Sequence, residues 1–187
     1  MLYSFTCREG ERHPAPAPPT PARGTEAMDE TTNTGRAARG AAAVAGFLAA
    51  AAKAGATLTP GDRAELGRAA VEAYGPVIGD PDDALCLALS DILADLYHHA
   101  DDTQAPHALL GAALMELSTT VNMLPVLEAL GDDGRPGILT ATIAAVLAYG
   151  DEHGVCIHAV TSLAYEYWAE EVEEERFMRL RAQHATE

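Results

Sequence analysis

The segment DPDDALCLALSDILADLYHHA, residues 80–100, decides the fold because it joins a clear helix start to a long apolar stripe. Its first four residues, Asp80-Pro81-Asp82-Asp83, place carboxylates where they meet the positive end of a helix dipole. Apolar residues then recur at the helical period, and they predict the buried face of this helix: Leu89, Ile92, Leu93, Leu96 and Ala100.

Similar start signals recur along the chain and predict successive helices from about residue 36. Thr59-Pro60-Gly61-Asp62 offers a capping threonine, a proline at the first helical position and an acid in the first turn. Gly75-Pro76 ends that helix, Pro106 begins a fourth, and the last helix begins at about Ile157.

The remaining segments complete an all-α prediction. In the fourth helix we expect an inward face of Leu110, Ala113, Leu114 and Leu117, and residues 131–137 (GDDGRPG) predict a loop. No segment alternates with period two for long enough to predict a strand. We therefore expect an all-α bundle of five or six short helices built from helical hairpins.

The N-terminal region has a different composition. Residues 1–35 lack an apolar period and contain the Pro-rich run HPAPAPPTPARG, which is typical of a disordered tail. Residues 36–187 then form a single helical domain with a projecting acidic C-terminal helix. An alternative is that residues 1–27 are a mis-called start and that Met28 is the true first residue.

The charge is concentrated in the helical body. The 187 residues contain 12 Lys+Arg and 28 Asp+Glu, a net charge of −16. Residues 69–175 hold 20 of these acids and one base, Arg135, which gives this segment a net charge of −19. Such a surface repels nucleic acid and anionic lipid. We therefore expect no direct nucleic-acid binding and no membrane contact, and we expect any protein partner to be basic and held in a salt-sensitive way.

The cysteines and the apolar runs indicate a reduced compartment. Cys7, Cys86 and Cys156 show no Cys-x-x-Cys spacing. The uncharged, mostly alanine run Ala41–Ala52 is too short to span a bilayer. We therefore expect a cytoplasmic protein.

The motifs of several enzyme classes are missing from the sequence. It contains no Gly-Lys pair of a phosphate-binding loop, no GxGxxG, no GxSxG, no HExxH and no EF-hand loop. Lys53 is the single lysine, which disfavours Schiff-base chemistry. We therefore expect no catalytic residue and no cofactor.

One face of the helix at 80–100 could hold a metal. Asp91, Asp95, His98 and Asp102 fall within about 60° of one another at about 100° per residue, opposite the leucine stripe. Carboxylates and an imidazole at this spacing can converge on a divalent ion. The alternative is the solvated face of an amphipathic helix, with His98 exposed. We favour the solvated face and expect no tight metal site.

A second cluster of possible ligands lies in EHGVCIH. His153, Cys156 and His158 offer nitrogen and sulfur ligands for zinc or copper, but their spacing matches no closed tetrahedral pattern. We favour the alternative, in which Cys156 is a small apolar residue entering the last helix.

The C-terminal helix offers the candidate interaction residues. Trp168 follows the helical spacing of core residues, so we interpret it as a core anchor, with a binding groove as the alternative. The helical end beyond Val172 could serve as a docking handle for a partner or for a homo-oligomer. The candidate residues for this role are Trp168, Glu170, Glu171, Glu173, Glu174 and Glu175.

Three classes of function remain. The leading hypothesis is a small, acidic, non-enzymatic protein-interaction or regulatory module. The first alternative is an acidic decoy that mimics nucleic acid on the basic surface of a nucleic-acid-binding protein. The second alternative is a helical metal-dependent enzyme that uses Asp91, Asp95 and His98.

Overall fold

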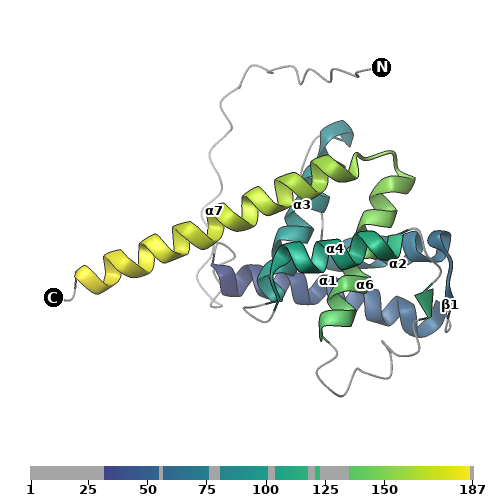
Figure 1. The fold of residues 1–187 in the computed structure, drawn as a ribbon, viewed down its shortest axis with the longest axis horizontal. Coiled ribbons are helices and arrows are strands. Elements are labelled where there is room, and N and C mark those ends of the chain that lie inside the picture. The colour runs from purple at the N-terminus through teal and green to yellow at the C-terminus, as the bar shows by residue number, and fades with distance from the viewer. Residues whose placement is uncertain are drawn as a thin grey trace, which may run out of the picture.

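The computed structural model describes residues 32–54, 57–75, 81–100, 104–117, 121–122 and 135–185. These residues form six α-helices and one pair of two-residue strands, which confirms the predicted all-α class (Figure 1). The helices are α1 (Asn33–Ala54), α2 (Pro60–Tyr74), α3 (Pro81–His99), α4 (Pro106–Leu117), α6 (Arg135–Glu152) and α7 (Ile157–His184). The strands β1 (Thr57–Leu58) and β2 (Val121–Asn122) pair antiparallel, with Thr57 opposite Asn122.

Two predicted boundaries need correction. Most of the predicted tail, and the alternative start at Met28, lie outside the described residues, but positions 33–35 are already helical. The reason is a cap: the Thr32 hydroxyl accepts a hydrogen bond from the Gly35 amide at 3.1 Å. In the predicted loop at 131–137, residues from Arg135 onward belong to α6, because a proline is readily accommodated in the first turn of a helix.

The start of α2 forms as its sequence predicts. The Thr59 side chain accepts from the Asp62 amide at 3.3 Å, and the Asp62 carboxylate accepts from the Thr59 amide at 2.9 Å. This reciprocal capping box satisfies two backbone donors that the first turn leaves without partners. At the other side of α2, the buried Arg63 donates from Nη1 to the Leu117 carbonyl at 2.8 Å, which ties α2 to the end of α4.

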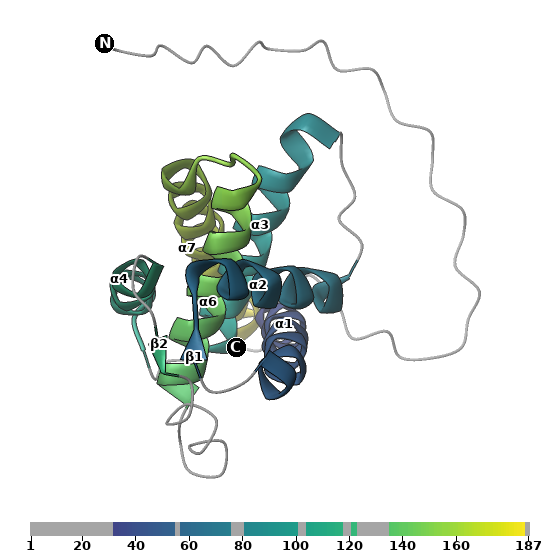
Figure 2. The same cartoon turned by 90° about the vertical axis from the view of Figure 1, so that its right-hand side faces the viewer.

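The core lies where α3 and α6 meet the other helices. The predicted apolar stripe of α3 is buried throughout, from Leu89 to Ala100. The largest fully buried side chains come from five helices and β1: Phe47, Leu58, Leu66, Leu89, Ile92, Leu93, Leu96, Leu109, Ile143, Val146 and Leu147. The closest helix pairs are α2 with α6, α1 with α2, α1 with α3, α3 with α7 and α4 with α6, and Figure 2 shows α2 lying across α6.

The predicted inward face of α4 is wrong at Leu114, which is 42% exposed. Of the other predicted residues, Ala113 is buried and Leu110 and Leu117 are partly buried against the core. Leu109, which the prediction left out, is also buried. Helix α4 is apolar on several sides, so its periodicity alone could not select a face. Its packing on α6 buries the side that carries Pro106, Leu109 and Ala113.

Glycine allows the helices to approach closely. A Cβ atom at Gly67 of α2 would lie 2.0 Å from the Ala145 carbonyl oxygen of α6. Both groups are held by helical backbone, so a side chain at position 67 would force the two helices apart.

Helix α7 extends past the other helices. Its first turns pack on α3 and bury Val160, Thr161 and Ala164, but every residue from Arg176 to Ala185 is exposed (Figure 1). Among the described helices, none combines the length and the apolar character needed to cross a membrane.

Candidate functional site

The prediction that one face of α3 is solvated is wrong for Asp95 and His98. Asp95 is only 2% exposed, and the His98 side chain is only 4% exposed. The reason is that α1 and α7 pack on α3 on the side opposite its leucine stripe, so both sides of the helix are covered. Asp91 is exposed, and Asp102 lies outside the described residues.

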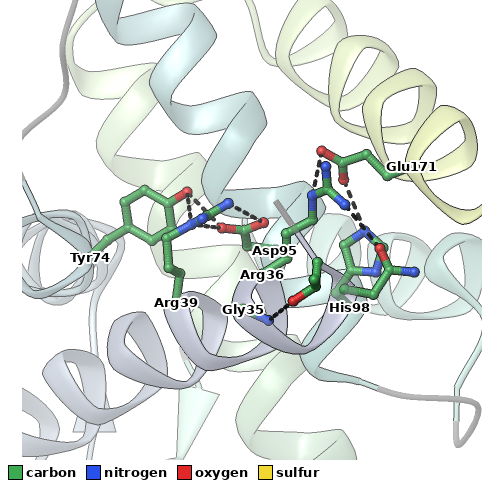
Figure 3. Close-up of polar contacts among 9 residues, drawn as sticks. Gly35, Arg36, Arg39, Tyr74, Asp95, His98 and Glu171 are labelled. Carbon is green, nitrogen blue, oxygen red and sulfur yellow. Dashed lines mark hydrogen bonds and ion pairs between the residues drawn. The ribbon is translucent and has the colours of Figure 1, made fainter. Parts of the chain in front are cut away.

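Asp95 is held by one arginine and one tyrosine. The Arg39 guanidinium donates from Nε to Oδ2 of Asp95 at 2.7 Å and from Nη2 to Oδ1 at 3.3 Å. The Tyr74 hydroxyl donates to the same Oδ2 at 2.7 Å (Figure 3). Both carboxylate oxygens are therefore engaged, by residues that come from α1 and α2.

The local sequence explains how α1 reaches Asp95. Gly40 follows Arg39, and a Cβ at Gly40 would lie 2.3 Å from the Asp95 carbonyl oxygen. The glycine therefore brings the two backbones together, and the neighbouring arginine spans the short remaining distance to the carboxylate. The sequence signal for this contact is the pair Arg39-Gly40, but the pair predicts a contact only when the helix that packs against it is known.

The electrostatics of this cluster reflect its burial. Burial raises the pKa of the Asp95 carboxyl, and the hydrogen bonds from Arg39 and Tyr74 oppose that shift. Burial and the adjacent carboxylate both raise the pKa of the Tyr74 hydroxyl. For Arg39, burial acts to lower the pKa, but the Asp95 carboxylate outweighs it and the pKa is raised.

A second cluster joins α1, α3 and α7. Glu171 accepts from Arg36 Nε at 2.9 Å through Oε1, and its Oε2 lies 2.9 Å from Nε2 of His98. Figure 3 shows Glu171 pointing inward from α7 toward these two residues. Glu171, one of the predicted interaction residues, is therefore turned toward the body of the protein.

Together the two clusters hold α1, α2, α3 and α7 in position relative to one another. They connect four helices through charged side chains whose partners lie within the chain. Asp95 is occupied by Arg39 and Tyr74, and Nε2 of His98 is occupied by Glu171, although His98 also lines the groove described below. This arrangement suits positioning of the helices rather than chemistry on a substrate.

The second predicted ligand cluster is spread over the turn before α7. The His153 ring contacts the Tyr149 ring in a tilted arrangement with centroids 4.2 Å apart, and its Nδ1 lies 2.8 Å from the Tyr149 carbonyl oxygen. Cys156 is the N-cap residue of α7 and is exposed, so it is not packed as an apolar core residue, because it precedes the first turn that contacts α3. His158 is also exposed. Across the described parts of the chain, no three His, Cys, Asp or Glu side chains are grouped closely enough to hold a metal ion.

A groove of about 730 Å³ separates the projecting part of α7 from the body. Trp168 lines this groove and also packs against the core. The residue therefore has both of the environments considered for it, that of a core anchor and that of a groove residue. Sequence reasoning missed Tyr97, a groove residue that is 2% exposed and whose hydroxyl has no hydrogen-bond partner. The sequence signal for its burial is its spacing, since Tyr97 follows Leu93 of the apolar stripe of α3 by four positions.

The remaining predicted interaction residues on α7 differ in whether they face the groove or the solvent. Glu175 faces the groove and pairs with Arg179 through Oε1. Glu170, Glu173 and Glu174 are exposed on α7. Among the described ion pairs of these five glutamates, only those of Glu171 reach the body, so Glu170, Glu173 and Glu174 can meet another molecule without breaking such a contact.

Comparison of the chain with protein-family models, with curated proteins and with solved structures finds no significant match in any of the three. The fold and the site define an all-α bundle, clamped by internal ion pairs, with one terminal helix that extends past the body. The functional argument therefore rests on the residues themselves.

Proposed function

We propose that the protein is a non-enzymatic protein-interaction module that presents the free side of α7 to another protein. The single observation that carries this proposal is the exposure of large apolar side chains at the end of α7. Phe177 is 58% exposed, Met178 is 57% exposed and Leu180 is 47% exposed. Phe177 and Leu180 lie three positions apart on one side of the helix, and Met178 adds a third exposed apolar side chain nearby. Such a group is typical of an interaction surface.

The charges on α7 describe the partner. Glu166, Glu170, Glu173 and Glu174 are exposed on the half of the helix that precedes these apolar side chains. A partner with basic side chains next to an apolar patch would match both parts of the surface. Its attachment would weaken as salt screens the charges.

The interior supports a binding role rather than a catalytic one. The buried carboxylate of Asp95 and the imidazole of His98 are both committed to contacts between helices. A general acid or base must reach a substrate. Asp95 faces neighbouring side chains instead, and Nε2 of His98, which lines the groove, is already held by Glu171.

A capture experiment tests the proposal. The full chain, attached through its N-terminus, is exposed to an extract of its native source, and the retained proteins are identified at about 50 mM and about 500 mM salt. We expect a protein with a basic, apolar surface segment, whether a different protein or a second copy of this chain, to be retained at the lower concentration and released at the higher one. The variant Phe177→Ser/Leu180→Ser should lose it.

A matched control is available on α4. Leu114→Ser/Met115→Ser removes two apolar side chains that are 42% and 77% exposed, and it should retain the partner. The proposal fails if no protein is retained, if the α7 variant binds as well as the wild type, or if the α4 variant loses binding equally.

A further inference from the structure

The side of α7 that faces away from α3 carries a regular seam of exposed residues. Counting from Glu166, the positions that share this side are separated alternately by four and three residues, the spacing at which two helices pack along their length. The seam residues are Glu166, Glu170, Glu173, Phe177, Leu180 and His184, and all six are exposed.

The two halves of this seam have opposite character. The first half consists of glutamates, whereas the second half holds Phe177 and Leu180 and is flanked by Arg176 and Arg181. The Arg181 guanidinium carbon lies 5.8 Å from the centre of the Phe177 ring, so this arginine lies beside the apolar part of the seam.

This polarity makes the seam complementary to itself in one orientation. If two α7 helices lay parallel, glutamates would face glutamates, which is unfavourable. If they lay antiparallel, the acidic half of each would face the apolar and basic half of the other. We propose that a second copy of this chain docks antiparallel along this seam and forms a two-fold symmetric dimer.

The proposal rests on the proposed function and names its partner. The basic, apolar element that the acidic half of α7 requires is present in the chain itself. Centring the pair on Phe177 places Glu173 opposite Arg181 of the second copy and Glu170 opposite its His184. By symmetry each such contact occurs twice, as in any isologous interface.

The body leaves room for this partner. Val160, Ala164 and Trp168 face the core, and the seam lies on roughly the opposite side of the same helix, with Leu180 at the edge that also borders the groove. Each α7 would therefore lie between its own body and the second α7. With this centring the contact runs from Glu170 to His184 and would extend about 21 Å, which fits a dimer that dissociates on dilution.

Sedimentation of the full chain tests the dimer. At about 50 mM salt we expect the mass to rise from one chain toward two as the concentration increases from about 1 µM to about 100 µM. Phe177→Ser should raise the dissociation constant by about tenfold or more. Met178→Ser is the matched control, because Met178 is equally exposed but lies off the seam, and it should dimerise as the wild type does.

A charge exchange tests the orientation. Glu173→Arg and Arg181→Glu should each weaken the dimer, and the two together should restore it, because each arginine then faces a glutamate of the other copy. Loss of the Glu173 pair with Arg176 within the helix cannot produce such a rescue. Circular dichroism of each variant checks that the helices remain.

Three results would overturn the dimer: a single-chain mass at every concentration, a dimer unaffected by Phe177→Ser, or no rescue in the double exchange. The capture experiment distinguishes these failures from failure of the proposed function. A monomeric chain that still retains a different basic protein through Phe177 and Leu180 would refute self-pairing and leave the interaction module standing.

Discussion

The ion pair between Arg39 and Asp95 and the ion pair between Arg176 and Glu173 use the same chemistry in two different environments. In the first, the carboxylate side chain is 3% exposed and both of its oxygens are engaged. In the second, the two side chains are 71% and 72% exposed and their charged atoms are 3.5 Å apart. Water and salt screen the second pair, whereas the first pair is sheltered by three packed helices.

The comparison teaches that burial, rather than residue type, decides what a charge contributes. The buried pair sets how α1, α2 and α3 fit together, because loss of one partner leaves a charge with no solvent to stabilise it. The exposed pair leaves α7 able to meet another molecule.

The largest effect should follow the loss of Arg39. In Arg39→Met the Asp95 carboxylate stays buried without its counter-ion, and the free energy of unfolding should fall by about 3 kcal/mol. Urea denaturation followed by circular dichroism measures this change. The double variant Arg39→Met/Asp95→Leu should recover much of the loss, and a double variant as unstable as the single one would show that packing, rather than charge, sets the effect.

The second largest effect on stability should come from the close approach of α2 to α6. Gly67→Ala places a Cβ against the Ala145 carbonyl and should lower the free energy of unfolding by about 1–3 kcal/mol. Gly111→Ala on α4 is the matched control, because a Cβ there meets nothing within 4 Å. That variant should be more stable by about 0.5–1 kcal/mol, as alanine favours a helix. Equal destabilisation of both would contradict the close contact between α2 and α6.

A smaller effect should appear at the capping box and should depend on pH. The hydrogen bonds from the Thr59 side chain and amide lower the pKa of the Asp62 carboxyl below its ordinary value of 3.8. Because the folded-state pKa is depressed, the charged carboxylate stabilises the fold above pH 3.8, and this contribution is lost as the pH falls through the folded-state pKa.

Comparison of the wild type with Asp62→Asn isolates that charge. Thermal denaturation should show the wild type as the more stable protein at neutral pH, with the difference closing in acid. A difference that is constant from neutral pH down to pH 2 would refute the assignment.

The smallest effect should come from the exposed pair. Arg176→Gln should change the free energy of unfolding by less than about 0.5 kcal/mol, measured at about 1 µM protein so that self-association does not contribute. A loss as large as that of Arg39→Met would mean that the end of α7 is buried in the protein in solution.

Several elements could be predicted from sequence because their determinants are local. The start of α2 depends on Thr59, Pro60 and Asp62, which are adjacent in the chain and form their cap without help from other helices. The apolar stripe of α3 was predicted equally well, because five large or small apolar residues repeat at the helical period.

The face of α4 and the environment of Asp95 could not be predicted in the same way. Helix α4 is apolar on several sides, so only its contact with α6 decides that Leu109 is buried and Leu114 exposed. A helical wheel places Asp95 and His98 opposite the leucine stripe, but it cannot show that α1 and α7 cover that side.

The amino-acid sequence by itself determined the helical class, most of the helix starts and the acidic charge of the body. Capping, helical periodicity and net charge depend on residues close together or on composition alone, so they need no knowledge of neighbours in space. Only the tertiary structure decided that Asp95 is buried against Arg39, that Glu171 faces inward and that Phe177 and Leu180 remain exposed. Arg39 and Asp95 are 56 positions apart, and their contact exists only because packed helices bring their backbones together and exclude the water that would otherwise solvate the Asp95 carboxylate.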